Sequence, residues 1–240
     1  MHRGERGLRT LSLLTSLLPE FAGLEFCETI WPNTAMEIAT KGRLTAQEYL
    51  AAERQAPTKS EFVDGEVFAM AGGTEIHSLL AVNLASELRT MLKGKPCKVY
   101  NSDMRLKVES TELYAYPDVQ VACGDLRFED AQHDTLLTPK IIVEVLSEST
   151  EKWNRGDKFW HYRHIPSFTD YVLVAQNAWL VEHYSRQPTG TWLLRASEGA
   201  EGVLHLASIS CAVPLIEIYA NTDIKPDAKP ATPKPELKKL

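Results

Sequence analysis

The sequence has no apolar run long enough to cross a membrane. None of its stretches reaches 18 consecutive apolar residues, whereas a membrane-spanning helix needs about 20. Near the start, three arginines precede a short apolar segment, residues 11–18, in the manner of a weak secretory signal. We expect an irregular extension there instead, with Met36 as an alternative start, because the patterned sequence begins soon after it. A cytoplasmic protein with no membrane partner is expected.

Cysteine is scarce, with only Cys27, Cys97, Cys123 and Cys211. These four form no Cys-x-x-Cys pair and have no histidine at ligand spacing, which argues against a structural zinc site. Their scattered positions give little support to a disulfide framework. We therefore expect reduced thiols in a reducing compartment.

The sequence also lacks an excess of positive charge. Lysine and arginine number 26 against 32 aspartates and glutamates, which gives a net charge of −6. This balance argues against a protein that binds nucleic acid through a general positive field. A local basic patch and a metal-dependent site, which needs carboxylates, are compatible with it. The hydrophobic fraction of 44% suffices for a core of ordinary size.

Local patterns predict an α/β fold with a mixed central β-sheet. We assign this domain to residues 39–222, because 1–38 show no sustained periodicity and 223–240 are rich in proline and lysine. Those two ends are predicted to be an irregular or disordered extension and a disordered tail. Helical patterns cover 44–55, 74–94 and 149–165; strand patterns cover 60–73, with a turn at Asp64-Gly65, and 97–109, 116–123, 138–147, 170–185, 191–196, 203–207 and 213–219.

Two of the predicted strands carry an acid at matching places. Asp118 lies near the start of one of them, and Glu144 lies inside the aliphatic stretch 141–146 of another. Because alternate residues of a strand share a face, the two carboxylates converge if the strands are neighbours. An ionised carboxylate in an apolar interior costs several kcal/mol, and two side by side repel unless a divalent ion lies between them. Carboxylate oxygens suit Mg²⁺ or Mn²⁺.

A lysine follows in the next predicted helix. Lys158 lies fourteen residues after Glu144, and Tyr162 shares its helical face four residues later. A lysine beside a metal-bound water can orient that water or stabilise charge that develops on a phosphate. On the strand of Asp118, Gln120 points to the same side as the acid.

Four segments of the chain, in their order, resemble the Uma-two family of restriction-endonuclease-like proteins. They are EFVDGEVFAMAGGTEIHSLLAVNL, YPDVQVAC, IIVEVLSEST and GDKFWHY, and the resemblance covers roughly residues 44–220. The PD and EVL elements also look like the PD-(D/E)XK pattern of nucleases. The resemblance implies a sheet flanked by helices and a Mg²⁺-dependent phosphodiesterase site, in which Asp118 and Glu144 bind the metal.

The sequence departs from the superfamily pattern at one position. The superfamily lysine stands two residues after the glutamate, where this sequence has Leu146. The resemblance implies that this role has moved to the next helix and hence to Lys158. His77 and Glu66 match further family positions, Glu66 as an additional ligand of metal or water and His77 as a contact to phosphate or water.

These features together predict an endonuclease that uses Mg²⁺ or Mn²⁺ to hydrolyse phosphodiester bonds of DNA. The predicted catalytic residues are Asp118, Glu144, Lys158, His77 and Glu66, with Asp118 and Glu144 as metal ligands. Leu146 supports an alternative, in which a catalytically inactive nuclease fold serves as a binding or regulatory module. A third hypothesis is a metal hydrolase that acts on another phosphate ester. A homodimer is expected by analogy with the superfamily alone.

Overall fold

The computed structural model describes residues 43–229. The predicted extension, 1–38, and the end of the predicted tail, 230–240, lie outside the described residues. The helices are α2 (Ala46–Glu53), α3 (Glu75–Met91), α4 (Glu151–Trp153), the π-helix η1 (Asn154–Lys158), α5 (Phe159–Tyr162), the 3-10 helix η2 (Ala207–Ile209) and α6 (Leu215–Ile218). The strands are β1 (Ser60–Val63), β2 (Glu66–Ala69), β3 (Cys97–Asn101), β4 (Arg105–Val108), β5 (Leu113–Ala115), β6 (Val119–Cys123), β7 (Thr135–Leu136), β8 (Ile141–Leu146), β9 (Asp170–Ala175), β10 (Leu180–Arg186), β11 (Trp192–Glu198), β12 (Val203–Leu206) and β13 (Cys211–Pro214).

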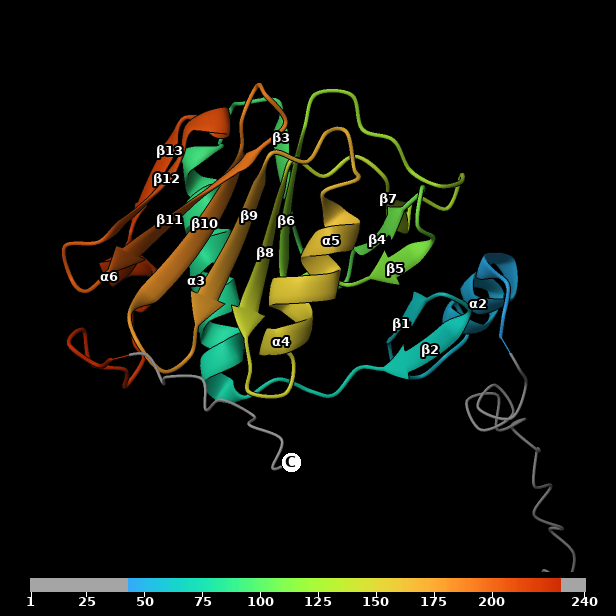
Figure 1. The fold of residues 1–240 in the computed structure, drawn as a ribbon, viewed down its shortest axis with the longest axis horizontal. Coiled ribbons are helices and arrows are strands. Elements are labelled where there is room, and N and C mark those ends of the chain that lie inside the picture. The colour runs from blue at the N-terminus through green and yellow to red at the C-terminus, as the bar shows by residue number, and fades with distance from the viewer. Residues whose placement is uncertain (1–42, 230–240) are drawn as a thin grey trace, which may run out of the picture. The chain divides into compact units, whose positions relative to one another are not determined.

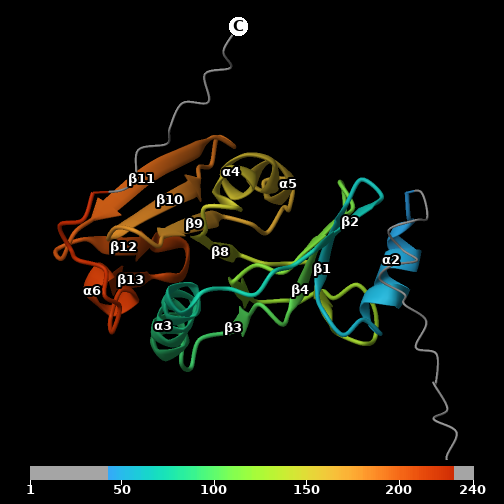
Figure 2. The same ribbon diagram turned by 90° about the horizontal axis from the view of Figure 1, so that it is seen from below.

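A six-stranded sheet lies at the centre of the fold (Figure 1), in the order β11-β10-β9-β8-β6-β3. β8 and β9 run parallel, and the other neighbours are antiparallel. All residues of β8 are buried, in agreement with its prediction as a central strand. α3 covers one face of the sheet, and α4 and α5 cover the other (Figure 2). The predicted fold class, α/β with a mixed sheet flanked by helices, is confirmed.

The side chains of β8 alternate between two apolar clusters on opposite faces of this sheet. Ile141, Val143 and Val145 pack in the cluster that contains the leucines of α3. Ile142 and Leu146 pack in the other cluster, which contains Tyr162 of α5. Because alternate residues of a strand share a face, Glu144 points to the side of α5.

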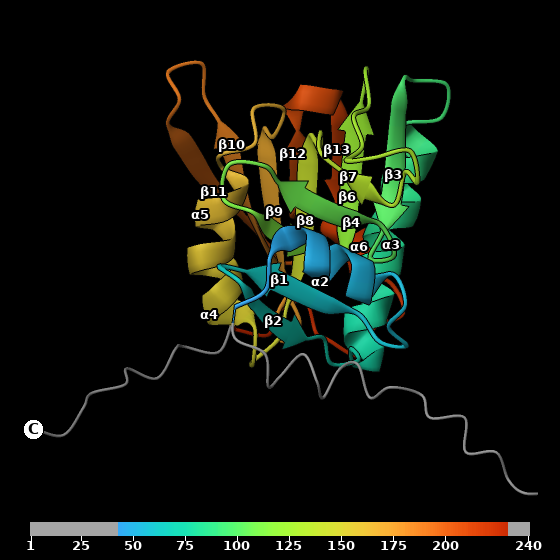
Figure 3. The same cartoon turned by 90° about the vertical axis from the view of Figure 1, so that its right-hand side faces the viewer.

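A second, five-stranded sheet carries the N-terminal hairpin, in the order β2-β1-β5-β4-β7. α2 lies against this hairpin (Figure 3), where Tyr49 stacks on Phe62 with 4.9 Å between ring centroids. The turn of the hairpin is Asp64-Gly65, with φ of 51° and 83°. A tight two-residue hairpin turn requires such left-handed conformations, so the turn predicted from the sequence is confirmed.

The first two helices begin at predicted capping residues. Thr45 caps α2, and with Glu48 it forms the reciprocal hydrogen bonds of a capping box. Thr74 caps α3, and its side chain accepts a hydrogen bond from the backbone N–H of His77. This cap fixes His77 in the first turn of α3.

The prediction of 97–109 as one strand is wrong. β3 ends at Asn101 in the six-stranded sheet, whereas β4 starts at Arg105 in the five-stranded sheet. Between them the side chain of Asn101 accepts a hydrogen bond of 3.2 Å from the N–H of Asp103, and this turn leads the chain from one sheet to the other. Arg105, although charged, is only 3% exposed.

The expectation of reduced thiols is wrong for Cys97 and Cys123, which form a disulfide. β3 and β6 pair with these two residues directly opposite each other, and their Cα atoms are 4.0 Å apart. Their positions 26 residues apart in the sequence carry no sign of this pairing. Cys211 is a buried free thiol.

The C-terminal part of the described chain also differs from the sequence-based prediction. The predicted strand 213–219 is divided, because Pro214 ends β13 with a φ of −61° that suits the start of α6. The predicted tail begins at residue 223, but Ile224 packs against the core cluster of α3. The carbonyl of Ile224 accepts a hydrogen bond of 2.7 Å from Trp179 Nε1. Between residues 43 and 229, no helix has the length and apolar character needed to cross a membrane.

Candidate active site

The two predicted acids lie on adjacent strands. β6 and β8 pair antiparallel with Val119 opposite Val143, and one step further along this register Asp118 comes opposite Glu144. Asp118 Oδ2 accepts a hydrogen bond of 2.7 Å from the backbone N–H of Val145. The condition on which the sequence prediction depended, that these strands are neighbours, is met.

Glu144 is a carboxylate in apolar surroundings, only 3% exposed. Its Oε1 accepts a hydrogen bond of 3.0 Å from Tyr162 OH and lies 3.0 Å from Lys158 Nζ. Burial raises the pKa of Glu144 to about 7; the charge of Lys158 opposes this rise, and the charges of Asp118 and Glu61 add to it. Near neutral pH, this carboxyl group can therefore take up or release a proton.

Lys158 lies between two carboxylates and is itself only 5% exposed. Its Nζ is 3.0 Å from Glu144 Oε1 and 2.8 Å from Glu61 Oε1. Burial acts to lower the pKa of Lys158, but the charges of Glu144 and Glu61 outweigh it and hold this pKa above its usual value. The ammonium group therefore stays protonated and compensates part of the negative charge around it.

The segment that carries Lys158 is not a plain α-helix. The predicted helix 149–165 is divided into α4, the π-helix Asn154–Lys158 and α5. Such wide turns are rare and occur frequently at functional sites. Lys158 and Tyr162, four residues apart, both reach Glu144 Oε1, as their shared helical face predicts.

Glu61 is a site residue that the sequence reasoning missed. It lies in β1, and its Oε1 meets Lys158 Nζ and lies 3.4 Å from the backbone N–H of Tyr116, which donates to it. The only signal in the sequence was the alternation of the strand, which turns Phe62 toward α2 and Glu61 to the opposite side. Its partner Lys158 is 97 residues away in the sequence, so no local pattern reveals the contact.

Glu66, which the sequence reasoning named, lies elsewhere on the same hairpin. It begins β2 directly after the turn, opposite Val63, and it is exposed. Its side chain forms no ion pair or hydrogen bond with the residues that the structure describes. The structure therefore brings together Asp118, Glu144, Lys158 and His77, but it does not bring Glu66 into contact with them.

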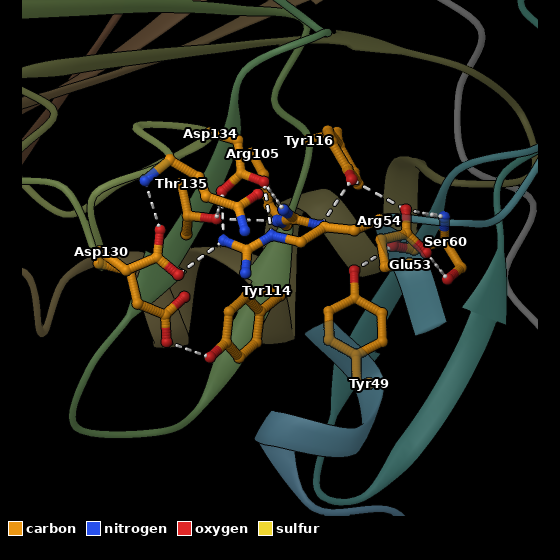
Figure 4. A network of polar contacts seen from close by, with 12 residues as sticks. Tyr49, Glu53, Arg54, Ser60, Arg105, Tyr114, Tyr116, Asp130, Asp134 and Thr135 are labelled. Carbon is orange, nitrogen blue, oxygen red and sulfur yellow. Dashed lines mark hydrogen bonds and ion pairs between the residues drawn. The ribbon is translucent and has the colours of Figure 1, made fainter. Parts of the chain in front are cut away.

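A buried glutamate holds the start of β1 in place (Figure 4). Glu53 accepts hydrogen bonds from the N–H and the hydroxyl of Ser60, at 2.9 and 2.5 Å, and from Tyr116 OH at 2.8 Å. Tyr49 OH donates to the carbonyl of Ser60 at 2.6 Å. Because Ser60 directly precedes Glu61, these bonds fix the strand that presents Glu61 to Lys158.

Beside Glu53 lies a second cluster of charges, formed by buried Arg105, partly exposed Arg54 and Asp134, and exposed Asp130 (Figure 4). Arg54 bonds Asp134 through two nitrogens, at 2.7 and 2.8 Å, and Arg105 lies 3.0 Å from the same carboxylate. Hydrogen bonding by Arg54 lowers the pKa of Asp134 to about 2. We call this the arginine cluster; it fastens the loop before β7 to the end of α2.

His77 stands at the open side of the site. Its Nε2 is 3.2 Å from Asp118 Oδ2, and the two side chains are 23% and 13% exposed. The hydrogen bond with Asp118 is the largest cause that raises the pKa of His77, and burial opposes it. A phosphate or water that approaches Asp118 therefore meets this imidazole.

The donor set suits a hard divalent cation. Asp118 Oδ1 and Glu144 Oε2 accept no hydrogen bond from residues 43–229, and Gln120 Oε1, on the face of Asp118, is buried without a partner in that range. Mg²⁺ commonly binds one or two carboxylates and completes its shell with water and substrate phosphate. No group of three or more histidine, cysteine, aspartate or glutamate side chains among the described residues is arranged to hold a metal. The remaining ligand positions would therefore fall to water and phosphate.

The family of the chain follows from a comparison with family models. The model of Uma2, described as "Putative restriction endonuclease", matches residues 46–213. The chain belongs to the Uma2 family. The resemblance seen in the sequence is thereby confirmed. Membership supports a nuclease function, that is, an enzyme that hydrolyses nucleic acid.

Relatives of this Uma2 protein include two uncharacterized proteins of Synechocystis sp. The protein sll1609 is 39% identical over 159 residues, which are 66% of this chain and 90% of its own length. The protein slr1290 is 35% identical over 177 residues, which are 74% of this chain and 92% of its own length. A solved structure from Anabaena variabilis, described as a "putative nuclease belonging to DUF820", matches with a TM-score of 0.59 at 13% identity. The match covers 73% of this chain and 97% of the Anabaena chain, and it supports the restriction-endonuclease-like fold.

Proposed function

We propose that this Uma2 protein is a Mg²⁺-dependent endonuclease that hydrolyses phosphodiester bonds of DNA. The observation that carries the proposal is the convergence of Lys158 on Glu144 beside Asp118. The residue two positions after Glu144 is Leu146, which is buried in the cluster of α5. The lysine comes instead from the π-helix and reaches Glu144 Oε1 at 3.0 Å.

Each side chain has a defined role in this proposal. Asp118 and Glu144 hold the divalent ion, which when bound lowers the pKa of a water and polarises the phosphate. The Lys158 ammonium keeps its proton at Nζ and stabilises the negative charge that develops on the phosphate. Glu61 orients that ammonium, and His77, held by Asp118, donates a hydrogen bond to a phosphate oxygen at the open side.

A second candidate function is a binding module without catalysis. The observation that favours it is the pairing of Lys158 with two carboxylates, because a purely structural ion-pair network also buries a lysine in this way. The two functions differ in one outcome. A binding module retains nucleic acid without cutting it, whereas the endonuclease requires Asp118, Glu144 and Lys158 for cleavage.

The test is cleavage of plasmid DNA, single-stranded DNA and RNA with Mg²⁺ or Mn²⁺. Variants Asp118→Asn, Glu144→Gln and Lys158→Met are expected to cut plasmid DNA at least about 100-fold more slowly, which is typical when one stabilising group is lost. Asp125→Asn and Glu201→Gln serve as matched controls, because both acids are exposed and form no side-chain contact in the described range.

Three outcomes would contradict the proposal. Cleavage at the wild-type rate in all three site variants would remove the site from the reaction. A complete lack of cleavage with every nucleic acid and both ions would favour the binding module. Cleavage of RNA but not of either DNA would retain the nuclease and exclude the DNA substrate.

A further inference from the structure

A basic hollow lies where the end of α3 meets the start of β3. It has a volume of about 370 Å³, and its charged lining residues are Arg89, Lys93, Lys95 and Lys98. All four are exposed, and no aspartate or glutamate lines the hollow. A chain with a net charge of −6 thus gathers four cations around one depression of its surface.

Most of these cations have no carboxylate partner. Arg89, Lys93 and Lys98 form no ion pair with the described residues, whereas Lys95 Nζ donates to backbone carbonyls, with 3.1 Å to that of Ile209. The dipole of α3 attracts cations to its C-terminal end and accounts for Arg89 and Lys93. It does not account for Lys98, which belongs to β3. The hollow is therefore short of negative charge.

One cation of the hollow, Lys98, faces the side of the sheet that carries the candidate active site. In the pairing of β3 with β6, Lys98 is opposite Ala122 and Tyr100 is opposite Gln120. Directly opposite residues share a face, so Lys98 points to the same side of the sheet as Asp118. Arg89 and Lys93 lie at the C-terminal end of α3, which covers the other face, so the hollow lies around the edge strand β3. Ala122 lies four residues after Asp118, or about 13 Å along a strand at ~3.4 Å per residue. A nucleic acid duplex covers this length in about four nucleotides.

We propose that this basic hollow binds backbone phosphates of the substrate, with Lys98 about four nucleotides from the bond that is cleaved. The inference rests on the proposed function, because it assumes a nucleic acid at Asp118 and Glu144. Phosphate contacts of this kind position a duplex and carry no sequence information. The hollow therefore holds the substrate in register with the active site and contributes equally to the binding of all sequences.

The test compares two double variants with the same change of charge. Lys93→Glu/Lys98→Glu alters the hollow, and Arg195→Glu/Lys229→Glu is the matched control, because these two cations are also exposed and unpaired in the described range. Binding of a fluorescein-labelled 20-base-pair duplex is measured by anisotropy in EDTA, where no cleavage occurs. Cleavage of plasmid DNA with Mg²⁺ is measured in parallel, and circular dichroism verifies folding.

The hollow variant is expected to bind the duplex at least about tenfold more weakly than the control variant. The slope of log affinity against log salt is expected to fall by about 2, because each lost phosphate contact removes close to one unit. Dinucleotides, which are too short to span the ~13 Å between the site and Lys98, are expected to bind both variants equally. Lys93→Gln/Lys98→Gln repeats the test with smaller change if the glutamates disturb folding.

The outcomes separate this inference from the proposed function. Wild-type cleavage with equal binding and salt slope in both double variants would overturn the inference and leave the endonuclease intact. Neither binding nor cleavage by the wild type would overturn both. A further measurement uses inorganic phosphate, to distinguish a site for small anions. If millimolar phosphate binds the wild type but not the hollow variant, and the duplex does not displace this phosphate, the inference is also overturned.

Discussion

The protein contains two groups of paired charges, and they differ in their balance of positive and negative charge. In the arginine cluster, two arginines form ion pairs with two aspartates, and the pKa of Asp134 falls to about 2. In the candidate active site, Lys158 is shared by Glu144 and Glu61 next to Asp118, and the pKa of Glu144 rises to about 7. The carboxyl group of Asp134 is therefore ionised near neutral pH, whereas that of Glu144 is close to taking up a proton.

The contrast between the two groups indicates that a further cation belongs in the candidate active site. A set of buried charges that serves stability alone is expected to be neutral and fully hydrogen-bonded, because an uncompensated buried charge is costly. The arginine cluster, two arginines paired with two aspartates, is neutral, and Arg105 is its one buried member among the four. The active site is not neutral, because its carboxylates outnumber its fixed cation, and a divalent ion would supply the charge that is lacking. The following changes test the comparison, from the largest expected effect to the smallest.

Replacement of the site lysine should have the largest effect. Lys158→Met leaves Glu144 and Glu61 buried without their cation, so we expect cleavage to fall by about 1,000-fold. Breaking a buried pair costs about 3–5 kcal/mol, but protonation of Glu144 relieves part of this, so the loss of unfolding free energy at pH 7 should be smaller. Urea denaturation and plasmid cleavage measure the two effects. Full cleavage activity and normal stability of Lys158→Met would show that Lys158 takes no part in cleavage.

Disruption of the arginine cluster should act on stability rather than on catalysis. Arg105→Leu removes the buried partner of Asp134 and should lower the unfolding free energy by about 2–3 kcal/mol, as for the loss of hydrogen bonds to a charged group. Cleavage per folded molecule should fall by much less than in Lys158→Met. Urea denaturation with plasmid cleavage again separates the effects. Equal loss of cleavage in the two variants would erase the distinction between the clusters.

The two glutamates of the hairpin offer a finer test. Glu61→Gln weakens the orientation of Lys158 and should slow cleavage by about tenfold, the lower end of the range for residues that orient the groups of a metal site. Glu66→Gln tests the residue that the sequence predicted, and the contacts favour a smaller loss for it than for Glu61→Gln. Steady-state cleavage of plasmid DNA decides the order. A larger loss for Glu66→Gln would return that residue to the site and remove Glu61.

The two carboxyl groups should respond to pH with opposite signs. The pKa of Asp134 is lowered from 3.8 to about 2, so its stabilising contribution is present above pH 3.8 and is lost as pH falls toward 2. The pKa of Glu144 is raised from 4.5 to about 7, so its contribution is present below pH 4.5 and is lost as pH rises toward 7. Urea denaturation in EDTA from pH 3 to 8 measures this.

Two variants isolate these contributions. Asp134→Asn should flatten the acidic part of the stability profile, and Glu144→Gln should flatten the part between pH 4.5 and 7. A profile of Glu144→Gln parallel to that of the wild type throughout this range would mean that Glu144 does not titrate there.

The site was predictable from sequence where its contacts follow strand and helix periodicity. Asp118 and Glu144 were found because an acid in an apolar strand is unusual, and Tyr162 because four residues make one helical turn. The tight turn at Asp64-Gly65 was readable because few residues adopt its left-handed backbone. In each case, a rule that acts over a few residues was enough.

The parts that were missed depend on pairings that join distant segments. Glu61 meets Lys158 because β1 lies next to the π-helix, and Cys97 meets Cys123 through the register of β3 and β6. The break of 97–109 into two strands depends on which sheet each half joins, and a continuous alternation of side chains does not record that change. Arg105 looked like a surface residue because its partner Asp134 lies in a loop 29 residues away.

The position of Lys158 depends on the number of residues in the wide turn of the π-helix. Each residue of an α-helix turns the chain by about 100°, so deletion of Gly156 would rotate α5 by roughly that angle relative to α4. Lys158 and Tyr162 would then leave Glu144 together, although no side chain that touches the site had changed. The position of Lys158 thus depends on the length of a turn, and insertions or deletions between 154 and 158 should be far less tolerated than substitutions at its exposed positions.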